Sequence, residues 1–405
     1  MSESKRPVRA ALPFIFVTIL LDVLSFGIII PVLPKLIERF MNGDTARAAE
    51  IFGLFGSVWA LMQFICSPIF GALSDRFGRR PVILLSNFGL GFDYIVMALA
   101  PTVSWLFLGR VISGITGASF TTASAYVADV TPPEKRAASF GMVGAAWGLG
   151  FILGPALGGL LGAYDPRLPF WGAAALTLIN ATYGLFVLPE SLPPERRAAF
   201  DWKKANPVGS LKLLRSHPEL FGLASVTALY FLAHQALQSV FVLYTSFRYG
   251  WNERMVGLTL TAIGVCTMIV QGGVVRRFVA RFGERRALLT GLVCGALGFT
   301  IYGLARTQNI FWSGLPIFAL MGLYGPSAQG LMTRRVDPSA QGQLQGANSS
   351  IMGITGMLGP SLFTLIFANF IGAHRNWQLP GAPFLLAALL LVTALALAWR
   401  VTKAT

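Results

Sequence analysis

Twelve apolar runs divide this chain, and short polar connections separate them. A helix of about 20 apolar residues is long enough to cross the hydrocarbon core of a bilayer. The composition agrees with that reading, because 54% of the residues are hydrophobic, only 12% are charged and the mean hydropathy is +0.64. The sequence therefore predicts an all-α membrane protein and excludes a soluble one.

The expected spans form two groups of six. The first group covers residues 10–33, 51–73, 81–100, 104–127, 139–162 and 168–188. The second covers residues 220–243, 254–275, 286–305, 309–331, 343–371 and 382–400. A polar segment rich in Pro, Arg and Lys separates the groups. We therefore expect a six-helix bundle over residues 1–188, a linker over 189–219 and a second six-helix bundle over 220–405.

Two motifs recur at the same distance along the chain. LSDRFGRRPVILL is echoed by VARFGERRALL, so Gly78 and Gly283 lie 205 residues apart. A Gly-Pro pair at 154–155 recurs at 359–360 with the same offset, which is close to half of the 405 residues. The offset predicts two pseudo-symmetric halves, and such internal repeats describe one large class of secondary transporters.

Basic residues gather in the connections on one side of the expected membrane. That side receives 23 Lys and Arg residues and the other receives 8, while Arg110 lies inside a span. Lys and Arg concentrate in cytoplasmic loops, so both termini and the linker are expected in the cytoplasm. The net charge of +15 is thereby explained as an orientation signal, without a nucleic-acid partner. The apolar run that starts the chain has no cleavage signal, which predicts a first span and not a removed leader.

Three ionisable residues interrupt the apolar runs: Asp22, Asp93 and Arg110. A charge within a membrane span is costly, so such a group faces a cavity or a partner and marks a functional site. Burial favours the neutral form of a carboxyl group, which suits proton exchange. Proton coupling is our expectation for at least one Asp; the alternative is a structural Asp hydrogen-bonded to a neighbouring helix.

Uncharged polar side chains and one histidine also lie within the spans. They are candidates for a substrate cavity, although some of them will only hydrogen-bond one helix to another. This group comprises Gln63, Asn180, His234, Gln235, Gln238, Gln271, Gln329 and Asn348.

The fifth span carries small residues at four-residue spacing, a pattern that allows close helix packing in a membrane. These residues are Gly150, Gly154, Pro155, Gly158 and Gly159. The run is not a dinucleotide-binding loop, since no strand precedes it. No metal-binding or nucleophile motif occurs elsewhere, and Cys66, Cys266 and Cys294 all fall in apolar runs. We expect neither an enzyme, nor a resident cofactor, nor a metal site.

Several motifs resemble those of a known family. GALSDRFGRRPVILL is similar to the loop signature between spans two and three of the major facilitator superfamily, and GLGFILGPALGG resembles the span-five signature of its exporters. The stretches LLDVLSFGIIIPVLP, FDYIVMALA, LGRVISGITGAS, YVADVTPPEKR and DPSAQGQLQG resemble the tetracycline/proton antiporters. The resemblance implies the twelve-helix major facilitator fold in a bacterial inner membrane and a carrier that works as a monomer.

The resemblance also implies a mechanism. A drug, carried in that family as a chelate with a divalent cation such as Mg²⁺, would leave the cell in exchange for a proton. By position, Asp22 and Asp93 would be the coupling carboxylates and Arg110 the cation that handles the proton. Gln63 and Gln271 would contact the substrate.

A cytoplasmic gate is implied by the same resemblance. Asp75 with Arg79, and Asp129 at the end of the fourth span, would form a charge cluster that latches one conformation. Arg76 and Arg80 belong to the same basic turn. A charge cluster of this kind is a two-state element, held in one conformation and broken in the other.

The second half departs from the tetracycline carriers at two positions. Gly295 stands where they hold an essential acidic residue in the ninth span, and Thr267 stands where they hold a histidine in the eighth. The expected function is proton-coupled export of tetracycline-like or other amphipathic drugs. The alternative is a proton-linked carrier of an endogenous metabolite, and a receptor or enzyme without transport activity has no identifiable site.

Overall fold

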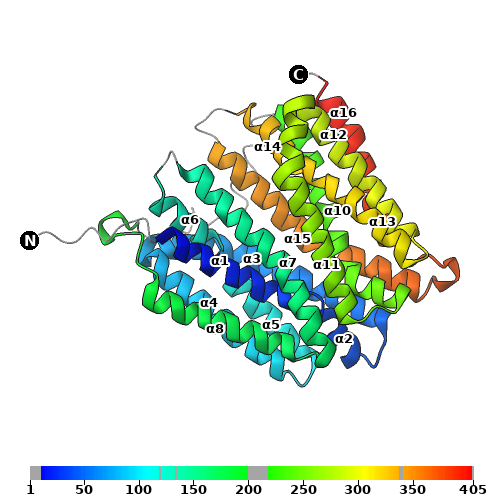
Figure 1. Cartoon of the computed structure of the whole chain (residues 1–405), viewed down its shortest axis with the longest axis horizontal. Helices are drawn as coiled ribbons and strands as arrows, with labels where there is room; N and C mark the ends of the chain where they lie inside the picture. Colours follow the sequence, from blue (N-terminus) through cyan, green and yellow to red (C-terminus); the bar gives the residue numbers. More distant parts are fainter. Residues whose placement is uncertain (1–10, 118–119, 133–134, 199–217, 337–340, 404–405) are drawn as a thin grey trace, which may run out of the picture. The chain divides into compact units, whose positions relative to one another are not determined.

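The computed structural model describes residues 11–117, 120–132, 135–198, 218–336 and 341–403. All regular structure in these ranges is helical (Figure 1). Within these ranges, ten helices are long and apolar enough to cross a membrane. The predicted all-α membrane fold is confirmed.

The helices follow the predicted spans. Those of the first half are α1 (Ala11–Ile29), α2 (Leu33–Phe40), α3 (Thr45–Phe77), α4 (Arg79–Leu99), α5 (Val103–Thr116), α6 (Phe120–Val130), α7 (Arg136–Tyr164) and α8 (Leu168–Val187). Those of the second half are α10 (Pro218–Tyr249), α11 (Glu253–Ile269), η6 (Val270–Val274), α12 (Val275–Leu304), α13 (Gln308–Ala319), η7 (Leu320–Leu323), α14 (Tyr324–Thr333), α15 (Gln341–Ile371) and α16 (Ala382–Val401). Two short 3₁₀ turns, η4 (Pro194–Arg196) and η9 (Arg375–Trp377), lie in connections.

The ten membrane helices cover fewer segments than the twelve expected spans for two reasons. Two expected spans are fused into one helical stretch, and another is divided into shorter helices. The helical stretch Glu253–Leu304 is 52 residues long and contains the expected spans 254–275 and 286–305. It bends at Gly283, whose φ of 81° is left-handed. The span expected at 309–331 consists of three shorter segments, α13, η7 and α14, and is not among the ten.

Backbone contacts divide the chain into two compact units. Unit 1 contains the described residues of 1–32 and 62–206, and unit 2 contains those of 33–61 and 207–405. The division differs from the expected boundary near residue 189, since α2 and the first half of α3 group with the second half of the chain. The linker expected at 189–219 lies partly outside the described residues, which stop at 198 and resume at 218.

Unit 1 is organised around α1, which packs against α7 and α8, while α4 packs against α8 and α5 (Figure 1). The contact between α1 and α7 is very close, because a Cβ on Gly154 would come within 2.7 Å of the Cα of Gly27. A Cβ on Gly158 would meet the carbonyl oxygen of Ile28, and one on Gly150 would lie 2.7 Å from Val23 Cγ1. Small residues on α7 therefore allow its backbone to contact that of α1.

Replacing Gly158 with Ala is expected to destabilise unit 1. The new methyl group would overlap the α1 backbone, which cannot rotate away as a side chain would, and overpacking of this kind costs about 1–3 kcal/mol. The melting temperature of the purified protein in detergent should fall. Gly148→Ala on the same helix is the matched control, because no atom lies within 4 Å of a Cβ there. Equal melting temperatures for the two variants would contradict the close contact.

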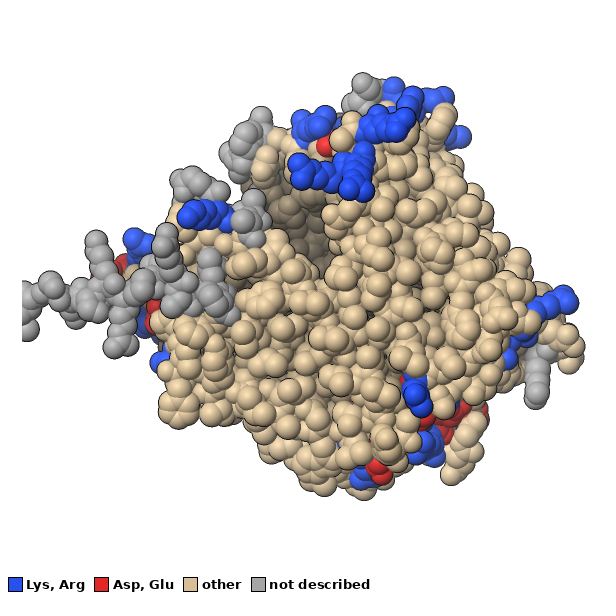
Figure 2. Space-filling view, viewed as in Figure 1, with Lys and Arg blue, Asp and Glu red and all other residues tan. Residues whose placement is uncertain are grey.

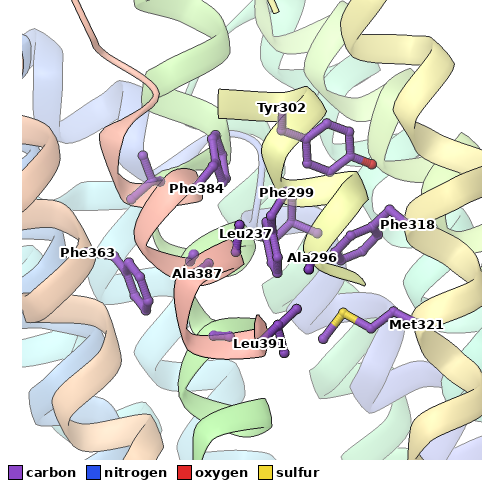
Figure 3. Close-up of a cluster of buried hydrophobic side chains, with 14 of the residues drawn as sticks. Leu237, Ala296, Phe299, Tyr302, Phe318, Met321, Phe363, Phe384, Ala387 and Leu391 are labelled. Carbon is purple, nitrogen blue, oxygen red and sulfur yellow. The ribbon is translucent and has the colours of Figure 1, made fainter. Parts of the chain in front are cut away.

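Unit 2 has an aromatic core. α10 packs against α15 and α16, and α12 packs against α16, α13 and α14. Figure 3 shows side chains from several of these helices converging around Phe299 and Phe384. The Tyr302 and Phe311 rings stack with centroids 4.3 Å apart, and Tyr244 Oη donates a 2.8 Å hydrogen bond to the carbonyl oxygen of Tyr302. The buried hydroxyl group of Tyr244 is thus paired while its ring fills the core.

The segment 33–61 is held in unit 2 by polar contacts and small residues. The ion pair between Arg39 Nη2 and Glu253 Oε1 is 3.3 Å long. On α3, Ser57 Oγ lies 2.8 Å from Ser361 Oγ of α15, and Gly56 leaves space for Pro360. The first half of α3 therefore contacts α15, although more than 300 residues separate them in the sequence.

Uncharged residues make up most of the surface shown in Figure 2. Large apolar side chains are exposed along the helices; Leu85, Phe92 and Phe186, for example, are more than half exposed. Such a surface suits contact with lipid tails. The chain is therefore a multi-pass membrane protein.

Candidate functional site

A buried carboxylate and a buried guanidinium group lie on the neighbouring helices α4 and α5 in unit 1. Asp93 on α4 is fully buried, and Arg110 on α5 is 9% exposed. The two side chains interact electrostatically. Gly109 provides the space for this arrangement, because a Cβ at that position would come within 2.9 Å of Asp93 Oδ1. Both carboxylate oxygens of Asp93 lack a hydrogen-bond donor among the described residues.

Asp22 lies on α1 and is held by a residue of α8. Asn180 Nδ2 donates a hydrogen bond of 2.8 Å to Asp22 Oδ1 and one of 3.0 Å to the carbonyl oxygen of Thr18. Asn180 is fully buried, whereas Asp22 is partly exposed. The fixed amide group orients the carboxylate and leaves its second oxygen without a hydrogen-bond donor among the described residues.

Tyr94 lies within electrostatic range of both carboxylates. Its side chain is almost completely buried and interacts electrostatically with Asp93, Arg110 and Asp22. The structure therefore brings together the three ionisable residues that the sequence singles out within membrane spans. We call Asp22, Asp93, Tyr94, Arg110 and Asn180 the membrane cluster.

Sequence reasoning did not identify Tyr94. A tyrosine in an apolar run is usually a core residue, and its only signal is that it follows Asp93 directly. Gln63, another expected cavity residue, lies on α3. Its side chain packs against the C-terminal end of α5. A Cβ added at Gly117, the residue that follows α5, would come within 2.8 Å of its Nε2.

His234 on α10 lies in a row of aromatic rings in unit 2. Its imidazole ring is nearly parallel to those of Tyr230, at 6.2 Å, and Phe318, at 6.5 Å. Tyr230 in turn stacks on Tyr324 at 3.9 Å. His234 Nδ1 is buried and has no partner in the described part of the chain. The row presents flat aromatic surfaces with the buried Nδ1 of His234 among them.

The remaining expected cavity residues of unit 2 are dispersed. Gln235 packs against Gly359, and Gln238 on the same helix is exposed. Asn348 Nδ2 on α15 donates a 3.2 Å hydrogen bond to Gln329 Oε1 on α14, so these two residues join helices. Gln271 is exposed and lies in η6, a π-helical turn. π-helical turns occur frequently at functional sites, which sets Gln271 apart from the other glutamines.

The basic turn between α3 and α4 forms a charge cluster around Arg79. Arg79 Nη1 donates hydrogen bonds of 2.6 Å to Asp75 Oδ1 and Ser74 Oγ. Its Nε donates one of 3.1 Å to Asp129 Oδ2 at the end of α6. Arg79 is 8% exposed, so its guanidinium group ties α4 to α3 and α6 in a nearly buried position. We define this charge cluster as Ser74, Asp75, Arg79, Asp129 and Glu190.

Glu190 is a member that sequence reasoning missed. Its Oε1 accepts a 2.9 Å hydrogen bond from the backbone N–H of Arg79, and its Oε2 accepts one of 3.3 Å from the N–H of Arg80. A carboxylate at this position satisfies the free N–H groups of the α4 N-terminus and complements the helix dipole. Gly78 makes the approach possible, since its φ is 105° and a Cβ there would overlap the Glu190 carboxylate.

The other two residues of the expected gate lie at the edge of the charge cluster. Arg76 is exposed, and its guanidinium group lies over the Phe77 ring at 5.1 Å. The Nη2 atom of Arg80 donates to the carbonyl oxygen of Leu185, near the end of α8. The structure therefore brings Asp75, Arg79 and Asp129 together and places Arg76 outside the charge cluster.

Glu190→Gln is expected to lower stability by about 1 kcal/mol, because the amide keeps one acceptor but removes the charge from the α4 N-terminus. Thermal unfolding of the purified protein would measure the loss. Glu195→Gln is the matched control: it lies in the same segment, is exposed and lies in η4 outside the charge cluster. A Glu190 variant as stable as the control would argue against the capping role.

The charge cluster has a counterpart in unit 2 with its charges reversed. Arg79 and Asp129 have Glu284 and Arg334 as their equivalents at the offset of 205 residues. Arg334 Nη2 lies 3.0 Å from Glu284 Oε1, against 3.1 Å for the unit 1 pair. In each pair, the first residue directly follows a glycine with a left-handed φ: Gly78 precedes Arg79, and Gly283 precedes Glu284. The duplicated halves therefore retain an ion pair at the same two positions while the basic and acidic partners change places.

Position 295, where the tetracycline carriers hold an acidic residue, lies in the packed interior of unit 2. A Cβ on Gly295 would come within 2.8 Å of Leu391 Cδ1 and 2.9 Å of Met321 Cγ, two residues labelled in Figure 3. An acidic side chain would require this apolar contact to open. Across the described residues, no three His, Cys, Asp or Glu side chains lie together in a way that could hold a metal ion.

Comparison with known proteins identifies the family. Residues 15–360 match the Major Facilitator Superfamily. The class C tetracycline resistance protein of Escherichia coli is 38% identical over 361 residues, which cover 88% of this chain and 90% of that protein. The class E protein of Escherichia coli is 35% identical over 373 residues, covering 92% and 90% of the two chains.

A solved structure agrees with this assignment. The human organic anion transporter MFSD10 (TETRAN) superposes with a TM-score of 0.72 at 25% sequence identity, covering 97% of this chain and 100% of that one. These relatives are transporters and not enzymes. With its duplicated halves, its all-helical membrane fold and a match over most of its length, the chain belongs to the Major Facilitator Superfamily of membrane transporters.

Proposed function

We propose that this transporter exports tetracycline-like or other amphipathic drugs in exchange for protons. The observation that carries the proposal is the membrane cluster, in which Asp22, Asp93 and Arg110 all interact electrostatically with one buried tyrosine. Ionisable groups at this depth mark substrate and proton pathways. Similarity to tetracycline resistance proteins over about nine-tenths of the chain supports the substrate class.

The proposed mechanism is alternating access. Asp93 has two oxygens without protein donors in the described chain, so a proton can bind them without displacing an existing hydrogen bond. A donor group on the substrate can do the same in a conformation that exposes this buried carboxylate. Asp22 is oriented by Asn180 and offers its second oxygen in the same way. Proton and substrate then compete for the carboxylates. Transport is driven only if the two ligands bind the inward-open and outward-open states unequally.

The proposed orientation places both termini in the cytoplasm of a bacterial inner membrane, since basic residues gather on that side of the chain. The charge cluster around Arg79 then lies at the cytoplasmic ends of α3, α4 and α6. We propose that it holds one conformation of the carrier and that the transporter works as a monomer. No resident cofactor is required, and a divalent cation such as Mg²⁺ would move as part of a chelated substrate.

A second candidate, a carrier of an endogenous metabolite, is favoured by one observation. Gly295 packs against Leu391 and Met321, so unit 2 offers no acidic group at the position used by the tetracycline carriers. A chelated cation would therefore depend on the carboxylates of unit 1. The two candidates differ in their substrates but share the same proton-coupling residues.

The test uses the whole protein in liposomes with a trapped pH dye. Tetracycline is added with and without Mg²⁺, followed by a panel of amphipathic drugs, and the Asp22→Asn variant is compared. We expect a substrate-evoked proton flux that requires Asp22. If no drug in the panel evoked a proton flux through correctly folded protein, drug export would be ruled out and the metabolite carrier would remain. A flux unchanged in the variant would rule out the role of Asp22.

A further inference from the structure

A groove runs along the surface of unit 2 between α12 and α16. Its volume is about 690 Å³, which lies within the usual range of ligand pockets, about 300–1,000 Å³. Most of its lining is apolar, and the lining residues are Leu289, Thr290, Val293, Val392, Leu395, Ala396, Trp399 and Arg400. Val293 and Val392 are exposed, so the groove opens on the surface of unit 2.

The groove is apolar along its length and basic at one end. α12 begins its second span near Arg285, whereas α16 ends at Val401, so Leu289 and Trp399 mark the same end. Arg400 lines that end. Arg286 precedes Thr290 by one helical turn and shares its face. Figure 2 shows Lys and Arg gathered over the region where Figure 1 labels α12 and α16.

Two further cations converge on the indole ring that closes the groove. Arg285 Cζ lies 5.2 Å from the centre of the Trp399 ring, and Lys403 Nζ lies 5.3 Å from it. Cations at this distance from a ring are attracted by it, but they also repel one another. Arg285 Nε is bonded to Thr402 Oγ1 at 3.1 Å, whereas its Nη2 is buried without a partner in the described chain. An anion between these side chains would relieve the repulsion among the three cations at this end.

The acidic side chain nearest in sequence does not neutralise this cluster. Glu284 precedes Arg285, but it points towards α14, where its Oε1 forms the ion pair with Arg334. A Cβ on Gly330 of α14 would also come within 2.6 Å of that oxygen. The positive charge at the groove end is therefore available to an outside ligand.

From this geometry we infer that the groove binds an anionic phospholipid. One acyl chain lies between α12 and α16 against Leu289, Val293 and Val392, and the headgroup phosphate lies among Arg285, Arg400 and Lys403. Basic pockets between membrane helices recognise lipid headgroups in this way, and Trp399 occupies the interfacial position that tryptophans prefer. The ligand is a lipid and not a free phosphate, because the apolar groove is continuous with the basic end.

The inference is tested by native mass spectrometry of the whole protein after delipidation in detergent. Phosphatidylglycerol and phosphatidylcholine with identical acyl chains are added separately. We expect preferential retention of phosphatidylglycerol and about a fivefold weakening of its binding in Arg400→Gln. Arg277→Gln is the matched control, since it removes the same charge from an exposed position on the same helix, outside the groove. Equal binding by the two variants would overturn the proposal.

A second variant tests the acyl-chain half of the site without changing any charge. Ala396→Trp would fill the groove and should abolish the preference for phosphatidylglycerol while the melting temperature without lipid stays unchanged. Glycerol phosphate carries the headgroup charge without the chains, and it should not displace the bound lipid. Displacement by glycerol phosphate, or a dimer that forms in place of the lipid complex, would show that the groove is not a phospholipid site.

Discussion

Asp93→Asn is expected to abolish uphill, proton-linked transport and to leave downhill exchange of substrate intact. The substitution preserves the size and shape of the side chain. Because Asp93 accepts no hydrogen bond from the described residues, Asn removes no observed contact. It removes the negative charge that interacts with Arg110, together with the ability to bind and release a proton. The carrier should then still alternate but without coupling to the proton gradient.

Two assays on the same liposomes separate these properties. The first measures accumulation of substrate against its gradient when a pH difference is imposed, and here Asp93→Asn should match empty liposomes. The second measures exchange of labelled for unlabelled substrate without a pH difference, and the variant should retain activity. Asp165→Asn is the matched control, because Asp165 is exposed at the end of α7 in the same unit.

The outcomes distinguish coupling from structure. Normal uphill accumulation by Asp93→Asn would exclude Asp93 as a coupling residue. Loss of both activities with a lowered melting temperature would mean that the negative charge is needed to balance Arg110. In that case the double variant Asp93→Asn/Arg110→Gln, which removes both charges, should regain stability but not proton coupling. A double variant with normal coupling would assign the proton pathway to other residues.

The membrane cluster was only partly predictable from sequence. Asp22, Asp93 and Arg110 stand out because a charge interrupts an apolar run, and that signal needs no knowledge of the fold. Tyr94 and Asn180 carry no such signal, since the rotation of each helix decides whether a polar residue faces a partner or the lipid. Only the packing of α8 on α1 shows that Asn180 reaches Asp22.

The fold was predictable to a similar degree. Apolar runs and the offset of 205 residues were sufficient for the helices and the duplicated halves. The grouping of residues 33–61 with unit 2 was not, because it depends on contacts such as Ser57 with Ser361 that are far apart in the sequence. The reversed ion pair was also hidden. A sequence repeat is detected by identical residues at equivalent positions. Glu284 stands at the position equivalent to Arg79, and Arg334 at the position equivalent to Asp129, so neither position is identical in the two halves.

Arg79→Gln is expected to have the second large effect, a loss of about 2–3 kcal/mol in stability together with slower transport. Its guanidinium group is nearly buried and bonds three acceptors on α3 and α6. The shorter, neutral amide cannot reach all three, so Asp75 and Asp129 would lose their shared partner. Arg79→Lys should also fail, because an ammonium group lacks the planar fork that serves several acceptors at once.

Thermal unfolding and initial transport rates would be measured on the same preparations. Arg76→Gln is the matched control: it removes the same charge three residues earlier, from an exposed side chain that lies outside the charge cluster. Arg334→Gln should fall between the two, since Arg334 makes one ion pair and its side chain is 74% exposed, where such pairs contribute about 0–1 kcal/mol.

If Arg79→Gln proved no more harmful than Arg76→Gln, the charge cluster would not join the helices. If it lost substrate affinity while its maximal transport rate stayed normal, the cluster would not hold a conformation. The predicted loss of stability is largest for Arg79→Gln, smaller for Arg334→Gln and smallest for Arg76→Gln. This order follows from the burial of each side chain and the number of its acceptors, although all three variants lose the same formal charge.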